Sequence, residues 1–306
     1  MSTSKRFTEG IAGPRQPRTL AARRPNRARA FLGTLARTRM AIPALGVLIV
    51  LILCAIFARQ LAPFDPITDQ IYREANQGPS AKHLLGTDYL GRDILSRLLF
   101  GARVSLTVGI VAVGIALLAG TTIGVSAGYC GGVVEAVLMR CVDAIAAFPA
   151  LILTLAITSA LGRGIVNAMI AIGIVSIPAF ARLSRAATLS AREADYVTAG
   201  RALGASDSRL IARYVLPNIA APLIVQASLL FAGAISIEAG LSFLGVGVQP
   251  PTPSWGVDLQ FGYQYMEINP ILAFAPGGAI FITVLAFNFF GDALRVVLDP
   301  RLSRRG

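Results

Sequence analysis

Charged side chains are scarce in this chain of 306 residues. Asp, Glu, Lys and Arg make up 14% of it, whereas 55% of the residues are hydrophobic. Water-soluble domains carry about 25% charged residues, and the mean hydropathy here is +0.66. The composition therefore excludes an ordinary soluble domain and indicates an integral membrane protein.

Lysine is rarer still, and its scarcity excludes one kind of chemistry. The two lysines are Lys5, which follows Ser4, and Lys82, which follows Ala81. A phosphate-binding GxxxxGK[ST] loop needs a glycine directly before its lysine. The chain therefore has no Walker A loop of its own.

Histidine and cysteine are equally sparse. His83 is the single histidine, and Asp88 and Asp93 beside it could hold only a hard cation weakly. We therefore favour a turn or helix-cap role for His83 over a metal site. No CxxC pair occurs among the three cysteines, Cys54, Cys130 and Cys141. Because they lie within or beside hydrophobic runs, we interpret them as small packing residues.

Six hydrophobic runs are long enough to cross a bilayer, which takes about 17 to 25 apolar residues. They are 40–58, 104–128, 144–161, 165–181, 219–245 and 271–290. Pro149 crosses the third run and Pro178 lies near the end of the fourth, so both spans are expected to be kinked or irregular. The pattern predicts an all-α, polytopic membrane protein with six transmembrane helices.

The net charge of +12 could suggest nucleic-acid binding, but membrane topology accounts for it better. Lys and Arg gather on the cytoplasmic side of membrane proteins. Six spans with both termini in the cytoplasm leave seven of the 28 basic residues outside, namely Arg59, Arg73, Lys82, Arg92, Arg97, Arg103 and Arg163. The predicted division is a basic cytoplasmic tail at 1–39, a first span at 40–58, an outer loop at 59–103, a transmembrane domain at 104–292 and a cytoplasmic tail at 293–306.

A polar insert separates the fourth run from the fifth. This charged insert, residues 193–217, lies between two runs that can each cross a bilayer, so it must contact something outside the membrane. Tyr196, Ala199, Gly200 and Leu203 fall at i, i+3, i+4 and i+7, which places small or apolar residues on one helix face. We predict that this stripe is a docking face.

Gly204 predicts the end of that helix, because glycine adopts the left-handed cap without a Cβ penalty. Ser206 or Asp207 can then cap a second short helix that runs to about Val215. Pro217 is predicted to close the insert and to open the next hydrophobic run.

Gly120, Gly124 and Gly128 recur every four residues and let a neighbouring helix approach closely. The same stretch matches the GxSxG string of serine hydrolases around Ser126. That chemistry needs a strand-turn-helix elbow and a histidine base, whereas His83 is predicted to lie on the opposite side of the membrane. We therefore predict a helix-packing stripe.

Glu238 lies about twenty residues into the fifth run. A carboxylate at such a depth costs about 2.5 to 3.5 kcal/mol if it faces lipid, so it must face protein or water. Two interpretations remain open: Glu238 lines or gates a solute path, or it makes an interhelical hydrogen bond. Asp143 and Arg140, near the inner end of the third run, are expected to serve topology or a local ion pair.

Four strings, in one order along the chain, resemble a known family. They are HLLGTDYLGRD at 83–93 with SR and GARVSL following it, the insert at 196–217, GLSFLGVGVQPPTPSWG at 240–256 and GDALRVVLDPRL at 291–302. Together they resemble the C-type permease subunit of dipeptide, oligopeptide and nickel ABC importers, over most of the chain after about residue 80. The resemblance implies a type I ABC importer permease fold in a bacterial inner membrane, with both termini cytoplasmic.

The insert is similar to the cytoplasmic EAA loop of these permeases, whose glycine precedes a Leu-Pro pair. The resemblance implies an ATPase-coupling segment at 182–217, with contacts through Tyr196, Ala199, Gly200, Leu203, Gly204, Ala205, Ser206, Asp207, Leu216 and Pro217. Thr198, Gly200 and Tyr214 depart from the family's usual glutamate, alanine and isoleucine, which affects the detail of the contact.

The resemblance also implies partners. They are a homologous second permease forming a heterodimer, two cytosolic ABC ATPases that bind ATP and Mg, an extracytoplasmic substrate-binding protein and the lipid bilayer, without nucleic acid. The chain itself is then neither an enzyme nor the holder of a cofactor. Its expected cargo is a di- or oligopeptide, with glutathione-like peptides or a nickel chelate as alternatives. A secondary, ion-coupled transporter is the main competing function.

Overall fold

The computed structural model describes residues 40–298, and every regular element in this range is helical. In chain order the elements are α2 Ala41–Ile56, α3 Ala58–Leu61, the 3₁₀ turn Tyr72–Glu74, α4 Ile94–Cys130, α5 Gly132–Ala146, α6 Ala150–Leu161, α7 Ile165–Arg192, α8 Asp195–Ala202, α9 Asp207–Leu210, the π turn η2 Ile211–Val215, α10 Leu216–Phe243, α11 Trp255–Gln264 and α12 Ile271–Leu298. The predicted tail at 1–39 lies outside the described residues.

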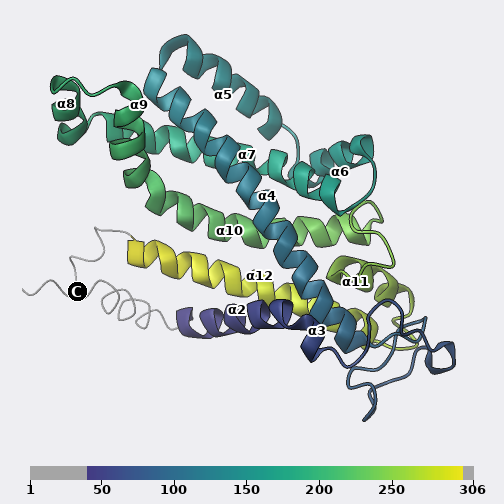
Figure 1. The fold of residues 1–306 in the computed structure, drawn as a ribbon. Helices are drawn as coiled ribbons and strands as arrows, with labels where there is room; N and C mark the ends of the chain where they lie inside the picture. Colours follow the sequence, from purple (N-terminus) through teal and green to yellow (C-terminus); the bar gives the residue numbers. More distant parts are fainter. Residues whose placement is uncertain (1–39, 299–306) are drawn as a thin grey trace, which may run out of the picture.

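Figure 1 shows α7, α10, α12 and α2 lying roughly side by side, with α4 crossing them diagonally. The short helices α8 and α9 lie at one end of this bundle, which we call the α8 end. The helix α11 and the long loop before α4 lie at the opposite end, which we call the α11 end. Since α4 reaches both ends, it connects the two polar regions of the molecule.

Four helical segments are long and apolar enough to cross a membrane: α4, α7, the continuous stretch Asp207–Phe243 and α12. The pair α5 and α6 makes a fifth if counted as one span, although its two helices meet at 91°. The apolar helix α2 has only 16 residues. Six spans were predicted, whereas residues 40–298 contain four clear candidates, or five with the bent pair.

The third predicted run differs most from expectation. Its helix begins at Gly132 rather than at residue 144, and it breaks between Ala146 and Ala150. Pro149 occupies the N-cap of α6 with ψ 129°, and a residue before proline avoids the helical region, so the chain must turn there. Pro178, in contrast, lies inside the unbroken helix α7.

Several element boundaries also differ from the hydrophobic runs. The helix α4 begins at Ile94, ten residues before the predicted span, because the Asp93 side chain accepts a hydrogen bond from Ser96 N at 2.8 Å. The helix α11 lies within a loop for which no helix was predicted. The helix α12 continues to Leu298, into the stretch assigned to the C-terminal tail.

The cysteine interpretation is correct in part. Cys54 is half-buried, whereas Cys130 and Cys141 are exposed. The packing role predicted for the latter two is therefore wrong within this chain.

The glycine stripe of α4 lies against α7. A Cβ on Gly124 would stand 2.3 Å from the carbonyl oxygen of Ala181, and one on Gly120 would stand 2.6 Å from Phe180 Cβ. A Cβ on Gly128 would likewise stand 2.8 Å from the carbonyl oxygen of Arg185. The two backbones are therefore closer than any larger side chain would allow, as expected for small residues at a membrane helix interface.

Candidate coupling surface at the α8 end

The helix α8 ends in a left-handed turn at Gly204, where the sequence predicts a helix stop. Gly204 has φ +80°, its N–H donates to Arg201 O at 3.0 Å, and the Ala205 N–H donates to Gly200 O at 3.1 Å. These two bonds form a Schellman motif, which needs a residue without a Cβ penalty at Gly204. The chain then turns at Ser206 and enters α9, so α8 and α9 form a helical elbow.

The elbow has a small core of its own. Val197 and Leu210 are fully buried, and a Cβ on Gly200 would lie 2.9 Å from Leu210 Cδ2. The Tyr196 and Tyr214 rings stack with centroids 6.5 Å apart. Gly200 thus holds α8 against α9, so it faces inward rather than belonging to an outward stripe.

Most of the remaining predicted docking residues are exposed, whereas Ala205 is half-buried. Leu203 is 89% exposed, Tyr196 is 41% exposed, and Ala199 and Gly204 are exposed as well. No Cβ contact within 4 Å would form at Gly204. Because Leu203 is exposed together with Tyr196 and Ala199 of the same helix, this face of α8 is a candidate contact for a partner protein.

Two side chains outside the predicted set make polar contacts with neighbouring helices at this end: Arg192 joins α7 to α4, and Tyr129 joins α4 to the elbow. The Arg192 guanidinium donates to the carbonyls of Gly128 and Tyr129 at 3.1 and 3.3 Å, and so caps the end of α4. The Tyr129 hydroxyl donates to Asp207 Oδ1 at 2.6 Å, and Arg201 Nη2 donates to the same hydroxyl at 3.4 Å. A basic residue in the last turn of α7 is visible in the sequence, but its partner on α4 is not.

The prediction that Pro217 closes the insert and opens the next run is correct in part, because α10 begins at Leu216 with Pro217 in its first turn, but the helix is not interrupted there. The helix runs from Asp207 to Phe243 without a break, through the π turn η2. Leu216 N donates to Ile211 O, a bond across five residues instead of four. In an α-helix the ring of a proline clashes with the carbonyl group four residues earlier. The wider π turn relieves this clash, so the chain accommodates Pro217 without ending the helix. The elbow is therefore a direct extension of α10.

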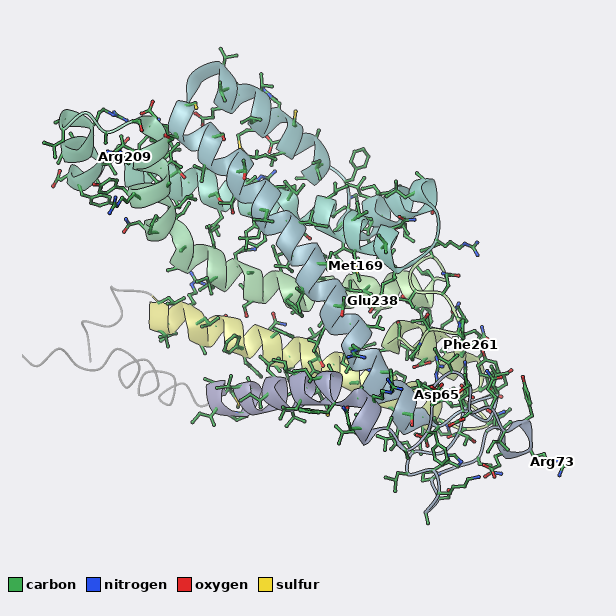
Figure 2. The ribbon with its side chains drawn as sticks, viewed as in Figure 1. Asp65, Arg73, Met169, Arg209, Glu238 and Phe261 are labelled. Carbon is green, nitrogen blue, oxygen red and sulfur yellow. The ribbon has the colours of Figure 1, made fainter. Side chains whose placement is uncertain are left out.

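Glu238 lies far from the elbow, near the C-terminal end of α10 and close to α4 (Figure 2). Its side chain is 0% exposed and accepts hydrogen bonds from the hydroxyls of Ser242 at 2.8 Å, Ser254 at 3.0 Å and Ser105 at 3.4 Å. The three serines come from α10, from the N-cap of α11 and from α4. This is the interhelical hydrogen-bonded arrangement that the sequence left open beside a gating role.

His83 organises the loop at the α11 end. Its side chain is buried, with Nδ1 2.9 Å from Asp93 Oδ1 and Nε2 3.1 Å from Glu74 Oε2. Asp93 is the residue that caps α4, so His83 orients the cap. The Lys82 ammonium, and then His83, hold the pKa of Glu74 below its ordinary value. Residues 40–298 contain no cluster of three or more His, Cys, Asp or Glu suited to a metal ion.

Arg97 joins three separate segments at the same end. Its Nε donates to Asp258 Oδ1 on α11 at 2.7 Å, and its Nη1 donates to Pro66 O in the loop at 3.0 Å. The loop residues Asp65 and Arg73 mark this end of the molecule in Figure 2. The α11 end is therefore a closed polar cap, whereas the α8 end presents an exposed elbow.

Two protein-family models match this chain. The family model described as "Binding-protein-dependent transport system inner membrane component" matches residues 120–304. A second model, "N-terminal TM domain of oligopeptide transport permease C", matches residues 28–79.

Several curated proteins are similar along most of the chain. A di/tripeptide transport system permease protein DppC of Pseudomonas aeruginosa is 44% identical over 286 residues, covering 91% of this chain and 93% of that one. A glutathione transport system permease protein GsiD of Pectobacterium atrosepticum is 42% identical, covering 90% and 91%. A dipeptide transport permease DppC of Alkalihalophilus pseudofirmus is 44% identical, covering 88% of each.

Among solved structures, a chain of the inward-facing MetNI methionine ABC transporter has a similar fold. The TM-score is 0.53 at 21% sequence identity, covering 65% of this chain and 95% of that one. At this level of identity the likeness concerns the fold alone.

Proposed function

Because this chain belongs to the family of inner-membrane permease components of binding-protein-dependent ABC transport systems, we propose that it is the permease of an importer that moves di- or oligopeptides, glutathione-like peptides included. The family consists of transport subunits rather than enzymes. The names of the relatives support the cargo, since they specify di/tripeptide, dipeptide and glutathione transport. A nickel chelate has no such support among them.

We further propose six spans, with both termini in the cytoplasm of a bacterium and the α8 end on the cytoplasmic side. The segments α2 with α3, and α5 with α6, supply the two spans beyond the four clear ones. The basic residues of the whole sequence support this orientation, because it leaves seven of the 28 outside and the other 21 on the cytoplasmic side.

The proposed partners are a homologous second permease, two cytosolic ATPases that bind ATP and Mg, and an extracytoplasmic substrate-binding protein. One observation carries the ATPase assignment: an exposed helical elbow, with Leu203 at its tip, is fastened both to α4 and to α10. A surface of this kind can receive a partner's movement and pass it on, because it is attached through the Tyr129–Asp207 hydrogen bond and an unbroken helix.

The mechanism we propose is alternating access. ATP-driven closure of the ATPase pair displaces the elbow, and α10 and α4 turn with it, so that the bundle changes from inward-open to outward-open. The Gly120, Gly124 and Gly128 contacts make α4 and α7 move as one body. The chain performs no bond chemistry in this cycle.

The substitution Gly204→Glu tests the docking assignment. The new side chain meets open space, so the span helices remain packed, but a carboxylate and a strained turn are placed beside Leu203. We expect the variant to remain in the membrane while copurification of the ATPases falls about tenfold. The matched control is Gly164→Glu, at a positive-φ glycine in equally open space between α6 and α7. Normal copurification and transport in Gly204→Glu would contradict the docking surface.

A further inference from the structure

A charged cleft lies between α5 and α7, beside the α8 end. Its volume is about 700 Å³, within the range of about 300 to 1,000 Å³ typical of small-molecule sites. The lining residues are Gly132, Glu135, Ala136, Met139, Arg140, Asp143, Arg182 and Arg185. Arg182 is ten residues before Arg192, so the cleft extends roughly 15 Å along α7 from the end of α4.

The five charged residues of the cleft are arranged in a defined way. Arg182 Nη2 contacts Asp143 Oδ1 at 2.8 Å, and Arg185 Nε contacts Glu135 Oε1 at 2.6 Å, so two ion pairs join α5 to α7. Arg140 is exposed and has no carboxylate within 4 Å among residues 40–298. The cleft therefore contains one free cation beside two carboxylates that are already fixed in position.

These charges flank the apolar runs 144–161 and 165–181, at the ends of the two helices that the proposed topology places on the cytoplasmic side. Lipid tails cannot solvate charged side chains at the end of a span, so these charges face a protein interior or water. A second permease packed flat over the cleft would have to bury Arg140 without a carboxylate on this chain, which is costly. The cleft therefore faces water at the cytoplasmic end of the bundle, where a transported solute would leave the membrane.

We propose that this cleft is the part of the solute path that receives the charged ends of a small peptide, with Arg140 binding its terminal carboxylate and Asp143 and Glu135 facing its ammonium group. The inference rests on the proposed function. A guanidinium matches a carboxylate through two parallel hydrogen bonds. The Asp143–Arg182 pair is half-exposed and so contributes little to stability, which allows its carboxylate to exchange partners as a peptide passes.

Weak binding at this position agrees with transport, because a passage must both admit its solute and release it. The arrangement also fits helix α5, which has Val142 as its one buried residue. Gly131 and Gly132, both at positive φ, precede this helix. The wall of the cleft that carries Arg140 is thus the less firmly packed one.

The first experiment measures accessibility to water. Ala136→Cys is introduced on the cleft wall, and Val133→Cys is the control on the same helix, 79% exposed but outside the cleft lining. Both are made in a complex in which the three native cysteines of this chain are replaced by serine. We expect a charged, water-soluble thiol reagent to modify Ala136→Cys, and dialanine supplied during ATP-driven transport to slow that reaction at least threefold, without an effect at Val133→Cys.

The second experiment tests recognition of the peptide carboxylate. Initial uptake of dialanine and of its C-terminal amide is compared in the assembled complex, with Arg140→Gln against the control Arg163→Gln, an exposed arginine between α6 and α7. We expect Arg140→Gln to reduce the ratio of dialanine to amide uptake about tenfold, while Arg163→Gln retains the parental ratio.

The outcomes separate this inference from the proposed function. If the parent complex transports peptides but Ala136→Cys is unreactive, lipid or a second permease occupies the cleft and the inference fails alone. It also fails if peptide protects Val133→Cys equally, or if Arg140→Gln keeps the parental ratio. Absence of peptide uptake by the parent complex would instead overturn the proposed cargo.

Discussion

At the scale of single residues, Glu238 is a shared acceptor. Three serine hydroxyls from separate parts of the chain donate to one carboxylate that has no exposed surface. Its effect is to hold the start of α11 against α4 and α10. Sequence reasoning could predict that this carboxylate must face protein, because of the cost of facing lipid. Ser242 is its i+4 neighbour on the same helix, but Ser254 and Ser105 are 16 and 133 residues away in the chain, and no periodicity reveals them.

Glu238→Ala is expected to destabilise the protein. Three buried hydroxyls would lose their common acceptor, and an unsatisfied buried polar group costs about 1 to 3 kcal/mol. The midpoint of thermal unfolding in detergent measures this loss. The control is Ser236→Ala on the same helix, whose hydroxyl bonds only to Ala232 O at 3.0 Å and whose loss should cost little. Equal midpoints for the two variants would show that the three hydrogen bonds to Glu238 contribute nothing to stability.

At the scale of elements, the elbow depends on a few polar contacts between α4, α7 and α9. The sequence predicts the two short helices and the Gly204 stop, because helix periodicity and glycine caps are local signals. It does not predict the π turn, since Pro217 reads as a helix break wherever only α-helical geometry is considered. It also cannot predict Tyr129 with Asp207, which pair across 78 positions of sequence.

Tyr129→Phe is expected to separate docking from transmission. The exposed surface around Leu203 is unchanged, so the ATPases should still copurify. The hydroxyl bonds to Asp207 and Arg201 are lost, so the elbow is held less firmly against α4, and we expect peptide transport per ATP hydrolysed to fall about tenfold. Tyr263→Phe, at an exposed tyrosine of α11, is the control. Unchanged transport per ATP would exclude a transmitting role for Tyr129.

The contact between α4 and α7 can be tested with two glycines of one helix. Gly124→Ala places a methyl group 2.3 Å from the Ala181 carbonyl oxygen, and overpacking of this kind costs about 1 to 3 kcal/mol. Gly114→Ala meets nothing within 4 Å. We expect the unfolding midpoint of the first to fall and that of the second to stay or rise. The reverse order would mean that the helices separate easily at the stripe.

At the scale of the whole molecule, α4 connects a closed cap to an exposed elbow. Arg97 and the Asp93 cap fix one of its ends, whereas Arg192 and Tyr129 hold the other. Hydropathy predicts α4, α7, α10 and α12, because long apolar runs are a strong signal. The bend at Pro149, the short α2 and the helix α11 depend on tertiary packing and turn geometry, which hydropathy does not record.

A chain built in this way should not drive transport by itself. It contains no Walker A loop, and its elbow has an exposed leucine where the proposed ATPases would bind. Purified protein reconstituted alone in liposomes is therefore expected to show no accumulation of labelled dialanine above the outside concentration, with or without a proton or sodium gradient. Adding the two ATPases, the second permease, the binding protein and ATP should produce accumulation, and Gly204→Glu in the same mixture should reduce it. Accumulation driven by an ion gradient in the single-chain liposomes would instead favour a secondary transporter, because the energy would then enter without the elbow.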